Sequence, residues 1–241
     1  MCYNKVMAKK AKRGFTIVEV SLVLAVTGLL LIGTIRGLSG SVARQRYNDT
    51  VQDFYDFLTN IYSKVANPSI SSDSLDATGD SGGTSEDTVI LGELVSFTID
   101  GDIRSATVFN DDHVTNFEKI SLSGSGDDIN IYTPVWDGEI QSTASDGQPF
   151  QGSLLITRSV NGDSIRTYYN SSANSTNMND NLGRFKTSSL TTSGELNFCV
   201  YSDDLSSAGG IRRNIRINAN AHNASAVSLV SVDSEDNLCA K

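Results

Sequence analysis

The chain carries little of the side-chain chemistry on which most enzymes and metal sites depend. Its 241 residues include only two histidines, three cysteines and three prolines. The run Asp111-Asp112-His113 is too local to converge on a metal ion, and no CxxC pair is present. The spacings of a phosphate-binding loop, a dinucleotide-binding loop, a serine-hydrolase elbow and a zinc-protease helix are all missing. We therefore expect no catalytic activity, no cofactor and no metal.

Charge is distributed unevenly along the chain. The net charge is −9, from 19 basic and 28 acidic residues, yet residues 1–14 hold five basic residues and no acid. Subtracting those five leaves 14 basic against 28 acidic residues, a net charge of −14. An acidic body is a poor general partner for DNA or anionic lipid headgroups. It suits a soluble domain that faces solvent.

Residues 15–36 form a predicted transmembrane segment. The stretch 15–35 contains a single charged side chain, Glu19. At about 1.5 Å per residue, a helix of this length spans roughly 30 Å, the thickness of the hydrocarbon core. Four basic residues between positions 9 and 13 precede it, so the positive-inside rule keeps the N-terminus in the cytoplasm. We expect a single-pass protein of the cytoplasmic membrane with an exported C-terminal part.

The residues alone leave several interpretations of this segment open. A secretory signal is disfavoured, because the candidate cut lies before the apolar run, between Gly14 and Phe15, and no convincing small-residue site follows Ile35. An uncut signal anchor remains open. A carboxylate inside a membrane helix costs about 2.5–3.5 kcal/mol. A helix that later pairs Glu19 with a cation in another subunit has a reason to carry it, whereas a tolerated acid that reaches the membrane surface is the alternative.

The string KRGFTIVEVSLVLAV resembles the class III leader of type IV pilins and type II secretion pseudopilins. The matching features are the basic leader of residues 1–14, Gly14 before the cut, Phe15 as the new N-terminus, Glu19 as the fifth mature residue, and the apolar run. The resemblance implies cleavage after Gly14 and N-methylation of Phe15 by a membrane prepilin peptidase. It also implies contact between Glu19 and the N-terminal amine of a neighbouring subunit. The implied partners are other pilin or pseudopilin subunits, an assembly platform protein and an assembly ATPase.

The helix is expected to continue beyond the membrane as an amphipathic half over residues 37–67. Apolar or aromatic residues recur there, most regularly from 51 to 65, at Leu38, Val42, Val51, Phe54, Tyr55, Leu58, Ile61, Tyr62 and Val65. Four charged residues fall off that face: Asp49, Asp53, Asp56 and Lys64. Asn67-Pro68 ends the helix, because the residue before a proline disfavours the α conformation. Many pilins carry a helix-breaking proline where this chain has Arg36, so the resemblance favours a minor pilin or pseudopilin.

The remainder predicts a β-rich head, residues 89–241, after a polar linker loop at 68–88. Short strand-like runs alternate with turns at 89–99, 103–109, 117–122, 129–135, 153–160, 164–169, 195–201, 211–218 and 226–232. Asp100-Gly101 and Asn161-Gly162-Asp163 are turn signals between them. The predicted fold class is therefore α+β, with a long N-terminal helix packed against an antiparallel β-sheet head. This layout resembles the minor pseudopilin head in architecture only.

Removal of a leader containing Cys2 would leave an even pair, Cys199 and Cys239. An even pair in an exported domain favours one disulfide, with two unrelated buried thiols as the alternative. A bond would close a loop of about 40 residues and stabilise the fold by roughly 4 kcal/mol. Many pilins carry a C-terminal disulfide loop, so the resemblance implies the same pairing.

Arg212, Arg213 and Arg216 form a small basic cluster in an otherwise acidic head. On a strand, Arg212 and Arg216 share a face while Arg213 points to the opposite one. Some pilin-like proteins bind DNA during uptake, so a DNA-uptake subunit that uses this strand is the first alternative function. The simpler explanation is a solvated strand balanced by nearby acids. A plain signal-anchored surface protein or enzyme is the third interpretation.

Overall fold

The computed structural model of the chain describes eleven stretches, which are residues 15–67, 89–98, 100–110, 120–122, 129–142, 149–158, 165–187, 194–201, 213–218, 224–231 and 238–239. The predicted leader 1–14 with Gly14 and the predicted linker 68–88 lie outside the described residues, as do Arg212 and both histidines. The chain divides into two compact units, Met1–Arg44 and Gln45–Lys241.

A single α-helix, α1 (Ile17–Ala66), runs through the N-terminal third of the described chain. This agrees with the one long helix predicted from the sequence, which was expected to end at Asn67-Pro68. The last backbone hydrogen bond at its end runs from the Asn67 amide to the Ser63 carbonyl at 2.9 Å. The proline at position 68 has no amide hydrogen with which to extend this ladder. The local sequence therefore determines where the helix stops.

The second unit contains two antiparallel sheets. The larger sheet has the order β3-β2-β1-β6-β7, with β4 also paired to β2. Its strands are β1 (Val89–Phe97), β2 (Ile103–Asn110), β3 (Ile120–Leu122), β4 (Asn130–Tyr132), β6 (Gly152–Arg158) and β7 (Ile165–Asn170). The smaller sheet has the order β10-β9-β8-β5. Its strands are β5 (Glu139–Ser142), β8 (Leu196–Tyr201), β9 (Arg213–Ile217) and β10 (Val227–Val230).

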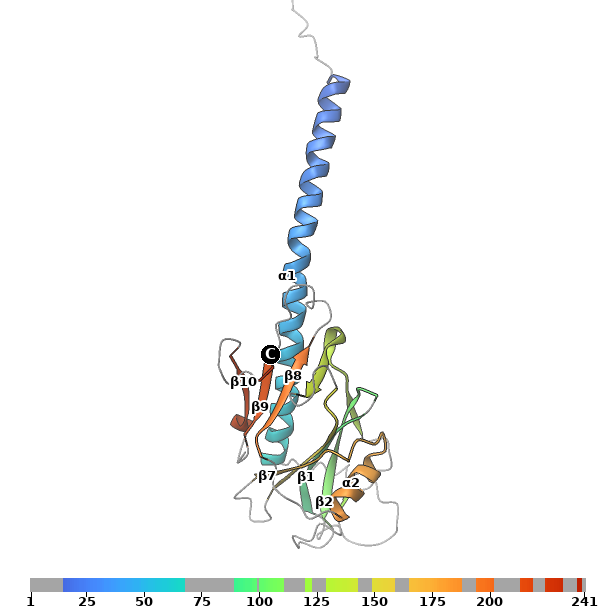
Figure 1. Ribbon diagram of the computed structural model, residues 1–241, viewed down its shortest axis with the longest axis vertical. Coiled ribbons are helices and arrows are strands. Elements are labelled where there is room, and N and C mark those ends of the chain that lie inside the picture. Colours follow the sequence, from blue (N-terminus) through green and yellow to red (C-terminus); the bar gives the residue numbers. More distant parts are fainter. Residues whose placement is uncertain are drawn as a thin grey trace, which may run out of the picture. The chain divides into compact units, whose positions relative to one another are not determined.

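Helices cover both faces of the larger sheet. A second helix, α2 (Met178–Thr187), buries Met178, Leu182 and Phe185 against one face, together with residues of β1, β2, β3, β6 and β7. The second half of α1 covers the other face, where Phe54 meets Phe97 of β1 with ring centroids 6.4 Å apart. Figure 1 shows α2 beside β1 and β2, and β8 beside the second half of α1. Strands of both sheets therefore pack against the second half of α1.

An aromatic cluster joins the two sheets and α1. Phe198 of β8 lies 5.7 Å from Phe54 of α1, 5.4 Å from Phe97 of β1 and 4.5 Å from Phe150, centroid to centroid. All four side chains are buried. Aromatic pairs at such distances add about 0.5–1.5 kcal/mol beyond the burial of their area. This cluster holds the two sheets together on the helix.

The predicted antiparallel α+β fold is confirmed, and two elements were missed. The helix α2 and the strand β5 occur where the sequence was expected to form neither helix nor strand. The four-residue β5 is too short to show alternation, and it is completed by its ladder with β8. The helix α2 is short and polar on average, with Gly183 inside it, so its intrinsic preference for a helix was weak. Both elements depend on tertiary contacts.

One predicted strand was too long. Residues 129–135 were expected to form a strand, but β4 ends at Tyr132 and a 3-10 turn, η3 (Val135–Asp137), follows. Pro134 separates the two, and a proline cannot donate a hydrogen bond to the ladder. By contrast, the Asp100-Gly101 turn signal is confirmed, because Gly101 has a φ of 86° in the connection between β1 and β2.

Candidate functional site

The first turn of α1 is closed by a reciprocal pair of hydrogen bonds between Thr16 and Glu19. The Thr16 amide and hydroxyl donate to Glu19 Oε2 at 3.1 and 3.2 Å, and the Glu19 amide donates to Thr16 Oγ1 at 3.2 Å. This is a capping box, in which two backbone amides without helical partners are satisfied by side chains. A carboxylate in the first turn is also stabilised by the helix dipole.

This arrangement corrects part of the sequence argument. The sequence argument considered two explanations for Glu19, a later pairing with a cation in another subunit and a tolerated acid that reaches the membrane surface. The capping box gives Glu19 a local structural role within its own subunit. The sequence contains the pattern of a capping box, T-x-x-E, at Thr16 to Glu19, directly before the apolar run. A role in assembly must therefore be tested against this simpler role.

The first half of α1 exposes an almost continuous apolar surface. Ile17 is 87% exposed and Leu29 is 72% exposed, and Phe15, which lies just before the helix begins, is 85% exposed. Within the part of the chain that the structure describes, α1 is the one helix long and apolar enough to cross a membrane. A surface of this size is not stable in water and needs lipid or another protein to cover it.

The second half of α1 presents its apolar stripe to the head. The buried residues are Tyr47, Val51, Phe54, Leu58, Ile61, Tyr62 and Val65. The stripe predicted for residues 51–65 is confirmed, except that Tyr55 is only half-buried. Val42, which was placed on the same stripe, is 44% exposed, so burial begins at Tyr47 instead.

Three tyrosine hydroxyls connect α1 to the rest of the head. Tyr47 donates to the Val200 carbonyl at 3.2 Å, Tyr62 pairs with Thr167 Oγ1 at 2.7 Å, and Tyr132 donates to Asp53 Oδ2 at 2.6 Å. Burial raises the pKa of Tyr62 to about 12, and its bond with Thr167 offsets part of the shift. Burial also raises the pKa of Tyr47 and of Tyr132. These hydroxyls stay protonated across the physiological range.

Lys64 and Glu93 form an ion pair between α1 and β1. The ammonium group contacts Glu93 Oε1, which also accepts a hydrogen bond from Thr107 Oγ1 at 2.7 Å. The Glu93 side chain is 2% exposed, whereas Lys64 is 46% exposed. Lys64 was placed off the apolar face of the helix, and that placement holds. The buried Glu93 carboxylate of β1 nevertheless contacts this polar side of α1. The periodicity of apolar residues along the helix does not predict such a contact.

The expected disulfide between Cys199 and Cys239 is present. Cys199 lies in β8, between β5 and β9, and both cysteines are buried. The strands β8, β9 and β10 are neighbours in this smaller sheet. The bond ties the C-terminal end of the chain to the middle of this sheet.

The two described arginines of the basic cluster do not share a surface. Arg213 lies near Tyr47, because its charge and its backbone hydrogen bond offset part of the rise in the pKa of Tyr47 that burial causes. Arg216 Nη1 instead lies 4.0 Å from Glu195 Oε2. They are three residues apart in β9, so they point to opposite faces, as the sequence indicated for Arg213. Among the described residues, β9 therefore offers no single basic face.

Neither a search for metal-binding clusters nor comparison with known proteins identifies a function for the chain. Within the described ranges, no group of three or more His, Cys, Asp or Glu side chains is placed to hold a metal ion. No family model, curated protein or solved structure matches the chain. A long apolar N-terminal helix with antiparallel sheets built on its second half is compatible with a pilin-like architecture. The functional argument therefore rests on the helix, its capped start and the head.

Proposed function

We propose that this chain is a structural subunit, a minor pilin or pseudopilin, of a type IV pilus or type II secretion-like filament. A prepilin peptidase cuts after Gly14 and methylates Phe15, and the first half of α1 stays inserted in the cytoplasmic membrane until assembly. A platform protein and an ATPase move it into a filament, where neighbouring subunits replace lipid around the helix. The observation that carries this proposal is the exposed apolar first half of α1, which continues into a helix half buried in a disulfide-bonded head.

Physical chemistry supports the role of the helix in assembly. The capping box accounts for a hydrogen-bonding side chain at position 19, but glutamine would complete it as well, so the cap does not explain the charge. That charge lies four residues after Phe15, within the apolar stretch, where a carboxylate is costly. Within the described part of the chain, the Glu19 carboxylate accepts hydrogen bonds from the amide and the hydroxyl of Thr16, both of which are neutral donors. The N-terminal amine of a neighbouring subunit would add a positive charge next to it. A charge-assisted hydrogen bond in a low-dielectric bundle is stronger than a neutral one.

The first test is the mature N-terminus. Mass spectrometry of the protein from its own cells is expected to find a chain that begins at N-methylated Phe15. A chain that begins before Gly14 would instead identify an uncut signal anchor. A cut after residue 35 would identify a secreted protein.

The second test separates the two roles of Glu19. Glutamine also completes a capping box, so Glu19→Gln keeps the helix start while it removes the charge. Glu19→Leu removes both. If assembly needs the charge, both variants are expected to be inserted and processed but to be lost from the sheared filament fraction, by roughly tenfold or more. Normal incorporation of Glu19→Gln with loss of Glu19→Leu would show that the carboxylate serves as a helix cap only.

A further inference from the structure

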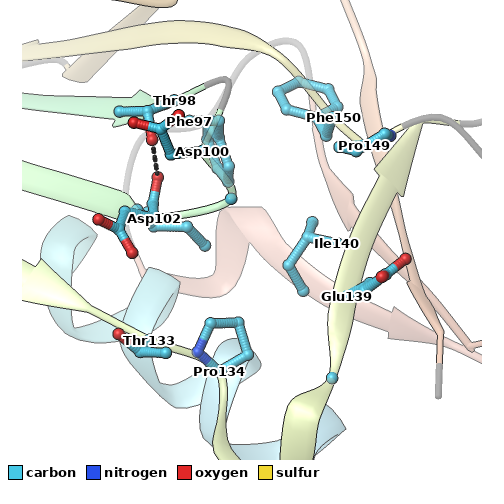
Figure 2. Close-up of a pocket in the computed structure, with 13 residues that line it drawn as sticks. Phe97, Thr98, Asp100, Asp102, Thr133, Pro134, Glu139, Ile140, Pro149 and Phe150 are labelled. Atoms are coloured by element: carbon cyan, nitrogen blue, oxygen red, sulfur yellow. Dashed lines mark hydrogen bonds between the residues drawn. The ribbon is translucent and has the colours of Figure 1, made fainter. Parts of the chain in front are cut away.

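The head contains a cavity of about 390 Å³ that the proposed filament role does not use. It lies where four segments meet, which are the β1–β2 connection, the stretch before η3, the start of β5, and Phe150. Figure 2 shows Pro134, Ile140 and Phe150 around its centre. The Glu139 carboxylate lies on the other side of β5 from Ile140 and accepts a hydrogen bond from Gln141 at 3.1 Å. The lining therefore selects no particular ligand, and we assign the cavity no occupant.

The sequence contains a second feature that the filament role leaves unexplained. The acceptor pattern for N-linked glycans is Asn-x-Ser/Thr, with any residue except proline in the middle. It occurs four times in the chain, at Asn48, Asn170, Asn174 and Asn223. A chain rich in asparagine, serine and threonine contains such triplets by chance, so the structure must decide which of them a transferase can reach.

The triplet at Asn48 is poorly placed for modification. It lies inside α1, where the backbone is fixed in a helix. The hydroxyl that completes the triplet belongs to Thr50, which is fully buried. That hydroxyl lies 3.0 Å from the Arg46 carbonyl oxygen and 2.9 Å from the Val135 carbonyl oxygen. A transferase therefore cannot contact it while the head is folded.

The triplet at Asn174 belongs to a segment that is fastened to α2. The Asn174 amide group donates to Gln151 Oε1 at 3.1 Å. The next residue, Ser175, is held through both of its backbone groups by the buried Asn181 side chain, at 2.9 Å from its amide and 2.7 Å from its carbonyl. A transferase would have to break these bonds to reach the triplet. The fourth asparagine, Asn223, lies outside the described residues.

Asn170 is the acceptor that the fold presents. It is the last residue of β7, and both Ser171 and Ser172 in the turn that follows are exposed. The Ser172 amide donates to Asn170 Oδ1 at 3.0 Å, which forms an Asx turn. This turn places the acceptor side chain next to the residue that completes its triplet. The bond uses the side-chain oxygen of Asn170, whereas the atom that receives a glycan is the nitrogen.

The same residue lies at the edge of the larger sheet. In the described sheet β7 is the last strand, and Asn170 pairs with Ser153 of β6. An edge strand presents backbone groups with which another chain can pair. A bulky, hydrated group at the end of this strand hinders such pairing and favours solubility. A glycan on Asn170 would therefore keep this side of the head in solvent.

We propose that Asn170 is an acceptor for an N-linked glycan, transferred from a polyprenyl-diphosphate oligosaccharide by a membrane oligosaccharyltransferase. In the transfer, Asn170 Nδ2 forms a bond to the anomeric carbon of the first sugar, and the bond from that carbon to the diphosphate breaks. The amide proton passes to a base of the transferase, and the polyprenyl diphosphate leaves. The proposal rests on export of the head, which is part of the proposed function, but not on assembly into a filament.

Mass spectrometry of the protein purified from its own cells tests this proposal. Trypsin releases residues 167–184 as one peptide, and electron-transfer fragmentation, which keeps sugars attached, distinguishes Asn170 from Asn174. A glycan is expected on Asn170. The same digest shows whether Cys199 and Cys239 are bonded, which reports export to an oxidising compartment.

Serine variants of the turn locate the modification. Ser172→Ala removes the hydroxyl that completes the triplet, so it is expected to abolish the glycan on Asn170. Ser171→Ala, in the same exposed turn, leaves the triplet intact and is the matched control, and Ser172→Thr is expected to keep the glycan as well. An unmodified Asn170 in disulfide-bonded protein would overturn the proposal without affecting the filament role. So would a glycan that survives Ser172→Ala, or one that Ser171→Ala removes equally.

Discussion

At the residue scale, polar groups decide how α1 is held as much as its apolar stripe does. Tyr62 is fully buried and reaches Thr167 in β7, while Lys64 reaches the buried Glu93 in β1. Each connects the helix to a different strand of the larger sheet. A buried hydroxyl left without its partner costs about 1–3 kcal/mol, so these contacts select one orientation of the helix on the sheet.

The buried tyrosine predicts how stability depends on alkaline pH. The pKa of Tyr62 is raised from its ordinary 10.0 to about 12 in the folded chain. Above pH 10 the unfolded chain therefore binds fewer protons than the folded one, so stability is complete below pH 10 and falls as the pH rises towards 12. The loss from this group approaches about 1.4 kcal/mol per pH unit.

Urea unfolding of the detergent-solubilised chain between pH 9 and 12 measures this dependence. The variant Tyr62→Phe is expected to be less stable at pH 8, because Thr167 loses its partner, but to lose less stability with rising pH. Parallel curves for the parent and the variant would contradict the prediction. Tyr47 and Tyr132, whose pKa values are also raised, remain in both proteins.

At the element scale, the larger sheet depends on a glycine in its central strand. The pairing of β1 with β2 shifts register between Ile90 and Gly92, which marks a β-bulge or similar irregularity. A Cβ on Gly92 would lie 1.9 Å from the Ile156 carbonyl oxygen of β6, which no side-chain movement relieves. Close approach of two backbones, rather than a positive φ, explains this glycine.

Two glycine substitutions are expected to act in opposite directions. Gly92→Ala should destabilise the head by about 3 kcal/mol, because the backbone of β6 must move. Gly183→Ala in α2 should stabilise it by about 0.5–1 kcal/mol, because the site has open space and alanine favours a helix. Thermal unfolding followed by circular dichroism compares the two. A stable Gly92→Ala variant would mean that β1 and β6 lie further apart than described.

The disulfide between Cys199 and Cys239 is a second feature that stabilises the head. The double variant Cys199→Ala/Cys239→Ala opens a loop of 40 residues and is expected to lose roughly 4 kcal/mol of stability on the chain-entropy estimate. Denaturant unfolding with and without a reductant measures it. The parent should fall to the level of the variant when it is reduced, and the variant should not respond. A parent that is equally stable after complete reduction would contradict this expectation.

At the scale of the whole molecule, the first and second halves of α1 have different surroundings. The described large apolar side chains of the first half are exposed, whereas the second half buries seven residues of one stripe in the head. A helix that is apolar on every side requires a membrane or a helical bundle, and one with a single stripe requires a globular partner. One continuous helix therefore serves two different environments.

Membrane orientation gives the prediction at this scale. Basic residues lie before the apolar span, so the head is expected on the far side of the cytoplasmic membrane. Alkaline phosphatase fused after residue 241 should be active in intact cells, since it folds only after export. Green fluorescent protein at the same position should stay dark when exported through the unfolded-chain pathway. The reverse pattern would place the head in the cytoplasm.

Much of this molecule could be predicted from the sequence. The extent of α1, its apolar stripe from 51 to 65 and most of the strands follow from local patterns. The pairing of the cysteines followed from their even number once a leader with Cys2 is removed. Periodicity, turn residues and proline act over a few positions, so they are visible in a single sequence. The capping box from Thr16 to Glu19 was equally visible but was overlooked.

Only the tertiary structure decided the remaining features. The short strand β5 exists because β8 lies beside it, and Lys64 finds Glu93 only once β1 lies on the helix. The cavity at Ile140 likewise needs four segments that are far apart in the chain. Local sequence determines which elements form and where they end, because those choices depend on neighbouring residues. Which polar groups meet, and where a cavity remains, depends on long-range packing that no local pattern records.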